Sequence, residues 1–342
     1  MAIATALGTT ASTSATAAAA VKPVVKKAPT ECNGHAELCA RRFNQVALAG
    51  THNSYAQAGA GFSEPAERRT VAEQLDDGIR AFMLDVYQGT PTTDPSSTSH
   101  VCTDPTPLKV TQLTGDLGKA TVDALIAQRN LVCPAAGGPT SALYLCHNFC
   151  ELGATPLADT LTALRTFLDA HPTEVVALIL EDYVTGSQVA TEFDAAGLTK
   201  RVYTHKLGAP WPTLGAMVKA KQQLVVFSEH GGGTPRWYLP AFKEMQDTPY
   251  TFQTAAQFSC ATNRGPAKAP LFLVNHWLAS TDVPGSAEAN AAAVNPAAVL
   301  GPRVEQCEQL RGQIPNIVAV EFAETADLLT VVDRLNEVAA RQ

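Results

Sequence analysis

The sequence contains no unbroken run of about 18 apolar residues, the length that a membrane-spanning helix needs. It is also poor in charge: Asp, Glu, Lys and Arg make up 17% of its 342 residues, and the basic residues are scattered rather than clustered. With a formal net charge of -7, this pattern excludes a polybasic membrane anchor and gives no support to nucleic-acid binding. The motifs G-x-S-x-G and H-E-x-x-H and the Walker loop are absent as well.

Eight cysteines are present, and most lie in polar, loop-like surroundings. An even set of this kind predicts four disulfides in an exported, secreted protein. The predicted pairs are Cys32 with Cys39, Cys102 with Cys133, Cys146 with Cys150, and Cys260 with Cys307. The spacing of Cys146 and Cys150 around His147 also suits zinc, but no second Cys/His pair completes a tetrahedral set.

The first 30 residues are rich in Ala, Thr and Ser and end in a Pro/Lys tail. They lack the basic start and the longer apolar centre of a typical signal peptide. We therefore expect an export signal remnant or a flexible linker over residues 1–30, and one folded domain over residues 31–342.

From residue 40 onward, short apolar runs alternate with segments of helical period. The runs occupy residues 45–50, 79–87, 142–147, 174–182, 223–229, 250–254, 271–277 and 316–322. Such continuous hydrophobicity is typical of strands buried on both faces. About eight strands with helices between them predict an α/β fold, a (β/α)8 TIM barrel of regular or irregular form with disulfide-stapled loops. An open doubly wound sheet is the main alternative, but no Gly-rich phosphate turn follows the first strand.

Polar residues follow the predicted strands at their carboxyl ends, where barrel enzymes carry their chemistry. They include His52, Asn53, Asp85, Tyr87, His147, Glu181, Asp182, Glu229, His230, Asn275, His276, Trp277 and Glu321. Because side chains alternate along a strand, one choice of parity points His52, Asp85, His147 and Glu181 into the barrel mouth, and Arg80 outward. Any one of these residues alone has a simple structural explanation. Four successive strands that present His, Asp, His and Glu on one face favour an active site.

Two histidines across a site suit paired proton transfers, in which one accepts the proton of a nucleophile and the other protonates a leaving group. Asn53 and the carboxylates offer hard oxygen ligands for a divalent cation. We expect Tyr87, Asp182, Glu229, His230, Asn275 and His276 to contact the substrate.

The ordered segments "THNSYA", "QLDDGIRAFMLDVY", "LCHNF", "PTEVVALILEDYV" and "PNIVAVEF" resemble the X-domain superfamily of phosphatidylinositol-specific phospholipase C. The resemblance covers about residues 40 to 335 and is closest to extracellular members from plants, fungi and bacteria. It implies a TIM barrel that cleaves a phosphodiester lipid by attack of the inositol 2-hydroxyl, giving a cyclic phosphate and diacylglycerol. It also implies that His52 lies beside the attacking hydroxyl and that His147 is the acid toward the leaving alkoxide.

The resemblance further implies a calcium site at Asn53, Asp85 and Glu181, with Ca²⁺ favoured over Mg²⁺. This chain departs from the metal-dependent pattern, because Met83 stands where that branch has a glutamate. A charge argument supports a cation: two carboxylates about 4 Å apart repel by about 4 kcal/mol at an effective dielectric constant of 20. No Lys or Arg lies at these strand ends with inward parity, so a metal is the expected counter-charge.

Two other functions stay open. A glycerophosphodiesterase or sphingomyelinase-D-like phosphodiesterase also uses two histidines and a metal on a similar barrel. A catalytically silent binding protein that keeps the barrel is favoured by Met83 and opposed by the two histidines. For the enzyme, the expected partner is a phosphodiester lipid or its head group, with transient contact to a membrane surface.

Overall fold

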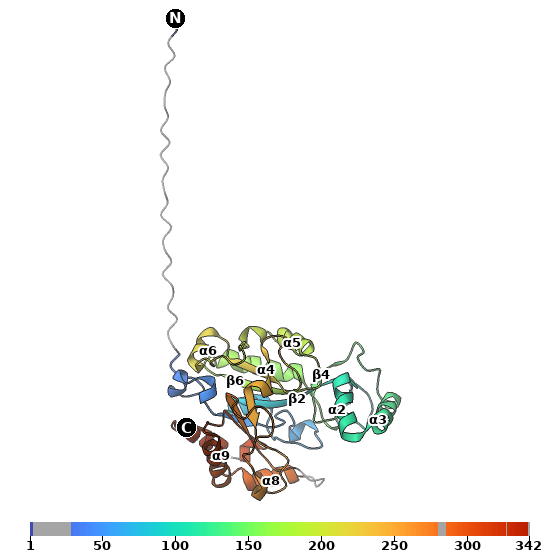
Figure 1. The fold of residues 1–342 in the computed structure, drawn as a ribbon. Helices are drawn as coiled ribbons and strands as arrows, with labels where there is room; N and C mark the ends of the chain where they lie inside the picture. Colours follow the sequence, from blue (N-terminus) through green and yellow to red (C-terminus); the bar gives the residue numbers. More distant parts are fainter. Residues whose placement is uncertain (3–28, 280–284, 326, 341–342) are drawn as a thin grey trace.

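The computed structural model describes residues 1–2, 29–279, 285–325 and 327–340. Figure 1 shows strands in the middle, flanked above by α4, α5 and α6 and below by α8 and α9. Most of the segment 1–30, which we expect to be an export signal remnant or linker, lies outside the described residues.

Eight parallel strands form one curved sheet in the order β8-β7-β6-β2-β1-β11-β10-β9. Their bounds are β1 Leu48–Thr51, β2 Ala81–Pro91, β6 Val176–Asp182, β7 Leu224–Ser228, β8 Tyr238–Pro240, β9 Met245–Asp247, β10 Leu271–His276 and β11 Ile317–Val320. In the part of the chain that the structure describes, β8 and β9 are not paired with each other. The fold is therefore a distorted TIM barrel with one open seam, which confirms the predicted class in its irregular form.

For two of the apolar runs, the prediction of a barrel strand is wrong. The run at 142–147 forms β4 (Ala142–Leu145), which pairs antiparallel with the outer half of β2 and does not join the barrel. Two further short strands, β3 (Val101–Thr103) and β5 (Thr155–Pro156), extend this antiparallel part. The run at 250–254 is a loop. The three-residue strands β8 and β9 complete the barrel instead, and they are too short to give an apolar run of their own.

Ten α-helices are present among the described residues, and those outside the α2–α3 pair lie around the sheet. Their bounds are α1 Val71–Asp76, α2 Pro107–Leu117, α3 Lys119–Val132, α4 Leu157–Ala170, α5 Gly186–Ala195, α6 Leu214–Ala220, α7 Ala241–Glu244, α8 Ser286–Val294, α9 Ala297–Arg311 and α10 Leu328–Leu335. The leucines of α4 pack on the sheet because they recur on one face of the helix.

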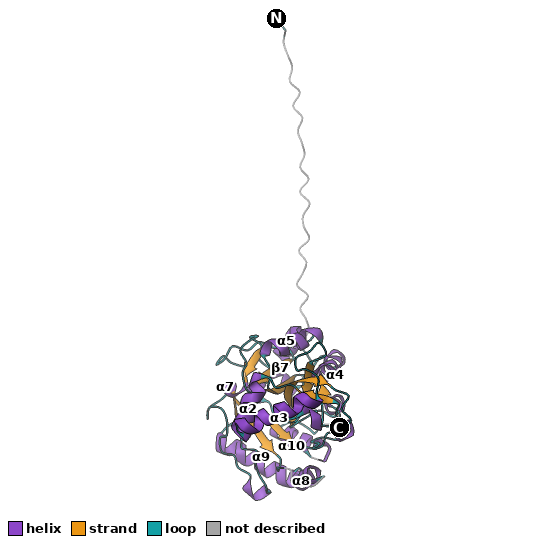
Figure 2. Cartoon of the chain, turned by 90° about the vertical axis from the view of Figure 1, so that its right-hand side faces the viewer, coloured by secondary structure: helices purple, strands orange, loops and turns teal. Residues whose placement is uncertain are grey.

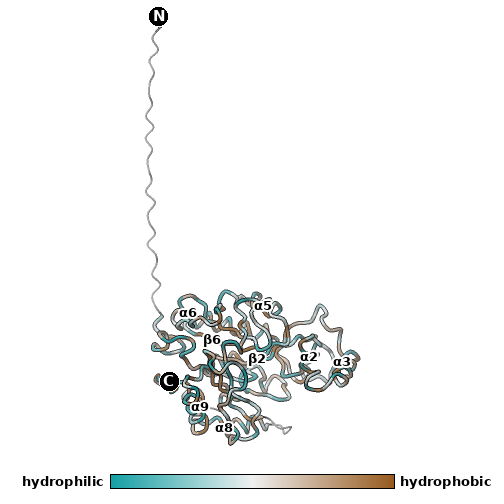
Figure 3. The backbone as a smooth tube through the Cα atoms, in the orientation of Figure 1, coloured by the Kyte–Doolittle hydropathy of each residue, from teal (hydrophilic) through white to brown (hydrophobic). Residues whose placement is uncertain are grey.

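Two apolar layers define the two faces of the strands. The inner one contains alternate strand residues such as Ala81, Met83 and Ile179, whereas the outer one contains Phe82 and Leu180 together with the helices. Figure 3 shows these hydrophobic stretches running through the middle of the molecule. The predicted parity is thus confirmed for β1, β2 and β6. Arg80 lies on the outer side, where its Nε donates to Glu174 (2.6 Å) and its guanidinium covers Phe167.

Gly50 allows the first strand to pack tightly inside the barrel. A Cβ at this position would lie 2.9 Å from Ile317 and 3.2 Å from the Cβ of Ala81. Both distances are shorter than ordinary van der Waals contact, so a larger residue would push the neighbouring strands apart.

Helices α2 and α3 form an insertion between β3 and β4. Figures 1 and 2 agree that this pair lies beyond the carboxyl end of β2, in front of the strands when the barrel is viewed from that side. The insertion therefore stands next to the barrel mouth rather than against the outer face of the sheet.

All four predicted disulfides are confirmed: Cys32–Cys39, Cys102–Cys133, Cys146–Cys150 and Cys260–Cys307. Since the sulfurs of Cys146 and Cys150 are bonded to each other, the zinc alternative is excluded for this pair. None of the described helices is both long enough and apolar enough to span a bilayer.

Candidate active site

A small cavity of about 50 Å³ lies at the carboxyl end of the barrel strands. It is lined by His52, Met83, Leu84, Asp85, Ile179, Glu181, Glu229, Tyr250, Arg264 and Trp277. The structure therefore brings together four of the predicted site residues, one from the end of each of β1, β2, β6 and β7. The space holds about one or two water molecules, so a sugar-sized head group has to displace side chains at its rim.

His52 is held on two sides at the end of β1. Its Nδ1 lies 2.9 Å from Oε1 of Glu321, which follows β11. Its ring stacks on Trp277, with centroids 4.0 Å apart and planes 5° from parallel. Because Nδ1–H donates its hydrogen bond to the carboxylate, the neutral imidazole keeps its proton on Nδ1 and has Nε2 as its free basic nitrogen.

His147 lies next to this cavity rather than in its lining, and its strand is placed differently from the prediction. It follows β4 in a bend, and Leu143 and Leu145 belong to the outer layer, so the shared inward face proposed for this strand is wrong. Its Nδ1 lies 3.6 Å from the carboxylate of Glu64, in a neighbouring cavity of about 240 Å³. Burial and the nearby charge of His52 lower the pKa of His147 below its ordinary value. The two histidines are thus within electrostatic reach of each other.

Asp85 and Glu181 lie side by side because β2 and β6 are paired in this register. Burial and the charge of Glu181 raise the pKa of Asp85 well above its ordinary value. The Tyr183 hydroxyl donates to Glu181. Asn53, in the left-handed region at φ 45°, accepts at Oδ1 from the Tyr55 hydroxyl (3.3 Å). This concentration of buried oxygen atoms and negative charge fits the preferences of a hard divalent cation.

Among the described residues, a single group of three His, Cys, Asp or Glu side chains has its ligand atoms close together. It consists of Cys102, Cys133 and Glu151. Its two cysteines form a disulfide, so it is no metal centre. Asp85 and Glu181 are without a third ligand of these types, and completion of their shell would fall to Asn53, water or substrate.

Arg264 is the main site residue that the sequence analysis missed. It lies in the loop between β9 and β10 and donates to Glu229 (2.6 Å) and to both oxygens of Asp247. Burial raises the pKa of Glu229 to about 7, although Arg264 opposes that shift. Arg264 therefore brings a basic side chain to the mouth from a loop, although none lies at the strand ends considered in the sequence. Periodicity could not have found Arg264, because it belongs to no strand.

Lys109 is a second buried cation near the mouth. Its Nζ donates to Gln112 (2.7 Å) and lies 4.7 Å from the ring centre of Tyr87 and 5.2 Å from that of Tyr183. Burial lowers the pKa of Lys109 to about 8, and the charges of Glu181 and Asp85 act in the opposite direction. Tyr87 itself is buried and stacks on Tyr183.

Three of the expected substrate-binding residues, Asp182, His230 and His276, contact the protein itself and do not line the cavity. Asp182, with outward parity, accepts from the Ser228 hydroxyl and from the backbone N–H of His230. The His230 ring places Nδ1 3.2 Å from the carbonyl oxygen of Asp182. His276 also points outward, where Nε2 contacts the carbonyl of Val294.

Asn275 faces inward, but its amide is used by the protein as well. Its Nδ2 donates to the carbonyl of Thr248 (2.6 Å) and to Asp247 (3.2 Å). Asn275 therefore supports the carboxylate that holds Arg264 and lies behind the cavity wall.

Comparison with known proteins identifies the family of this chain. The family described as PI-PLC X 1 matches residues 128–336, which is more than half of the chain. A PI-PLC X domain-containing protein 1 from Arthroderma benhamiae is 26% identical over 329 residues, covering 89% of both chains. An uncharacterized secreted protein of the same fungus and a PI-PLC X domain-containing protein of Arabidopsis thaliana are each 24% identical. The chain spans only 60% and 62% of the lengths of these two.

Among solved structures, phosphatidylinositol-specific phospholipase C from Listeria monocytogenes is 13% identical with a TM-score of 0.48, covering 88% of this chain and 97% of the other. A calcium-dependent phosphoinositol-specific phospholipase C from Pseudomonas sp. is 12% identical with a TM-score of 0.39, covering 85% and 95%. On the extent of the family match, this chain belongs to the PI-PLC X domain family.

Proposed function

We propose that the chain is an exported phosphoric diester hydrolase or lyase that cleaves a phosphoinositide-like lipid, with His52 as base and His147 as acid. The observation that carries this proposal is the environment of His52. A carboxylate fixes one ring nitrogen, an indole fixes the ring plane, and the second histidine lies within electrostatic reach. A residue that only stabilises the fold has no need of such an arrangement at the barrel mouth.

In the proposed reaction the 2-hydroxyl of the head group attacks phosphorus and gives its proton to Nε2 of His52. The new O–P bond closes a cyclic phosphate. The bond between phosphorus and the glycerol oxygen breaks, and His147 protonates the leaving alkoxide. Glu321 stabilises the imidazolium form of His52, as the carboxylate does in other carboxylate–histidine pairs.

The cavity suits an anionic phosphate if a metal cation adds its positive charge to the charges of Arg264 and Lys109. We propose Ca²⁺ at Asn53, Asp85 and Glu181, with Mg²⁺ as the second choice. The support is the pair of adjacent carboxylates and the raised pKa of Asp85. When bound, such an ion would neutralise charge on a phosphate oxygen. Glu229, Tyr87 and Arg264 are the proposed contacts to the head group.

The four disulfides support an oxidising, extracellular location. A lipid substrate implies that the protein works at a membrane surface for a short time in each turnover.

The test is hydrolysis of phosphatidylinositol, glycerophosphoinositol and sphingomyelin by the purified protein, with identification of the products. We expect inositol cyclic phosphate and diacylglycerol from the first substrate. A cyclic phosphate that keeps the lipid or glycerol would instead support the glycerophosphodiesterase or sphingomyelinase-D-like alternative. No turnover of any substrate, in a folded sample supplied with calcium, would support the silent binding protein.

The variants His52→Ala and His147→Ala should each lose at least about a hundredfold in rate. His171→Ala is the matched control, because this exposed histidine caps α4 before β6, at the opposite end of the strands. An activated phenolic leaving group needs little protonation as it departs. A substrate that carries one should therefore restore the rate of the His147 variant much more than the rate of the His52 variant. Near-normal rates in either variant would refute the assigned pair.

A further inference from the structure

An apolar cavity of about 420 Å³ lies beside the mouth, between the α2–α3 insertion and the barrel. Its wall is built mainly from the aliphatic side chains of Val110, Leu113, Val122, Leu125, Ile126 and Val132. The volume falls in the range of about 300–1,000 Å³ that is usual for small-molecule sites. Charged side chains such as Asp94, Arg129 and Glu151 also line it, but the aliphatic part of the wall favours an apolar occupant.

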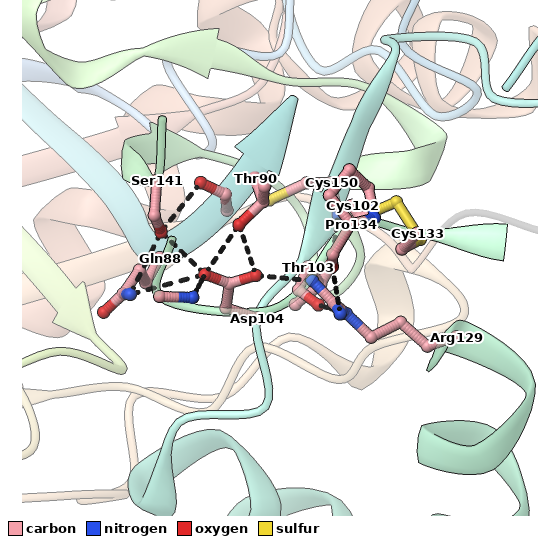
Figure 4. A network of polar contacts seen from close by, with 12 residues as sticks. Gln88, Thr90, Cys102, Thr103, Asp104, Arg129, Cys133, Pro134, Ser141 and Cys150 are labelled. Atoms are coloured by element: carbon pink, nitrogen blue, oxygen red, sulfur yellow. Dashed lines mark hydrogen bonds and ion pairs between the residues drawn. A yellow bond between two sulfur atoms is a disulfide. The ribbon is translucent and has the colours of Figure 1, made fainter. Parts of the chain in front are cut away.

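The cavity wall is fixed in place by a polar network on its barrel side. Asp104 accepts hydrogen bonds from Thr90, Ser141 and the backbone N–H of Gly137, and it forms an ion pair with Arg129 of α3 (2.6 Å). The disulfide Cys102–Cys133 joins β3 to the end of α3. Figure 4 shows both links. Because these contacts tie α3 to β2 and β3, the space is already formed before a ligand enters.

Exposed apolar side chains gather around the same insertion. Among the described residues, ten large hydrophobic side chains are exposed, and five of them belong to α2 and α3: Leu108, Leu117, Leu125, Leu131 and Val132. Such a concentration on one element marks a surface that meets apolar material.

The cavity adjoins the pocket of His147. Phe149 and Leu152 line both spaces, and Lys109 lies in the wall with its amine over Phe149 and the mouth tyrosines. An alkyl chain held between α2 and α3 would therefore lie next to the pocket that contains His147, the proposed acid toward the leaving oxygen. This adjacency favours the substrate's own chain over a second copy of the protein or a peptide segment.

From this arrangement we infer that the cavity binds one acyl chain of the lipid substrate. The inference rests on the proposed function and adds the place in this fold, the α2–α3 insertion, where a hydrocarbon chain of the leaving group binds. The head group would occupy the mouth while the chain leaves the membrane surface for the α2–α3 insertion. Affinity should then rise with chain length by up to about fourfold per methylene group buried, until the cavity is full.

The first arm of the test measures kcat/KM for phosphatidylinositols with four to eight carbons per acyl chain, dispersed as monomers. We expect a steep rise with chain length in the native protein and a flattened rise in Ile126→Trp, which fills the cavity. Leu131→Trp is the matched control, since Leu131 lies on the same helix, is 79% exposed and does not line the cavity. An unchanged chain-length dependence in Ile126→Trp, or an equal loss in both variants, would overturn the inference.

The second arm is independent of turnover. A phosphatidylcholine that carries a diazirine in a ten-carbon chain is photolysed with the protein, and the labelled peptide is mapped. Label on residues 107–132 that is lost in Ile126→Trp and kept in Leu131→Trp supports the site even if no substrate is cleaved, in which case only the proposed function fails. Label elsewhere, or a concentration-dependent dimer that Ile126→Trp disrupts, would overturn it in favour of another occupant.

Discussion

Glu321 and His52 are separated by 269 positions in the sequence, yet Oε1 of the first lies 2.9 Å from Nδ1 of the second. The contact exists because β1 and β11 are parallel neighbours whose carboxyl ends are in register, with Thr51 opposite Val320. Each residue then follows its strand by one position. The base of the proposed reaction is therefore oriented by the junction between the first and last strands of the barrel.

Replacing Glu321 by Gln should lower kcat by about 10- to 100-fold with little change in KM, because loss of a partner that orients a histidine usually costs this much. The measured quantity is the kcat-to-KM split, and Glu321→Asp, which keeps the carboxylate, should recover part of the lost kcat. Equal losses of kcat in Glu321→Gln and in Glu321→Asp would indicate a purely structural role.

Burial and the charge of His52 lower the pKa of His147, whereas Glu64 raises it. As an acid, His147 has to be protonated, so kcat/KM should fall as the pH rises through a pKa below the ordinary histidine value. Glu64→Gln removes the group that opposes this shift, and the alkaline limb should move further toward acid pH. The measurement is the pH profile of kcat/KM for both proteins. A limb that moves toward alkaline pH, or does not move, would contradict the assignment of His147.

Calcium should raise both activity and thermal stability, and excess chelator should lower both. Asp85→Asn and Glu181→Gln should abolish the calcium-dependent rise in melting temperature, which is a readout that needs no turnover. Asp182→Asn is the neighbouring control, because its carboxylate faces away from the cavity. Full activity in chelator, or an unchanged calcium effect in the two variants, would show that Arg264 and Lys109 suffice as counter-charges.

The disulfide Cys260–Cys307 closes a loop of 47 residues, and Cys32–Cys39 closes one of 7. In the chain-entropy description the longer loop contributes about 4 kcal/mol to the free energy of unfolding and the shorter one about 2 kcal/mol. Denaturant unfolding of the two Cys→Ala double variants should reproduce this order. A larger loss from the short loop would mean that native-state contacts, rather than loop closure, determine the effect.

Local patterns were enough to predict the strands that are buried on both sides. The run before His52 and the runs that contain Asp85 and Glu181 are continuously apolar, and the side of the strand on which each residue lies follows from the period of two. The structure places His147 in a cavity next to the mouth, after an antiparallel strand on the outer half of β2 and not on a barrel strand as predicted. An apolar run does not tell whether its neighbour is parallel or antiparallel, so this error could not be avoided from pattern alone.

Arg264 could not be predicted for a related reason. Its position depends on the course of the loop between β9 and β10, on its bonds to Asp247, and on Gly265, where an added Cβ would clash with the backbone of Met245. Lys109 belongs to an insertion whose helices read as ordinary surface helices. Side chains that loops and insertions bring to a site leave no periodic signal in the sequence. The disulfides were predictable because each bonded pair consists of two consecutive cysteines of the chain.

The open seam between β8 and β9 has a mechanical consequence. Near this point Arg264 joins Glu229, which follows β7, to Asp247 of β9. The other neighbouring barrel strands are joined by backbone ladders, whereas among the described residues β8 and β9 are connected through the short helix α7 and share no ladder. Release of the Arg264 guanidinium from Glu229 would therefore loosen the mouth at this seam, while the paired strands β1, β2 and β6 keep His52, Asp85 and Glu181 aligned.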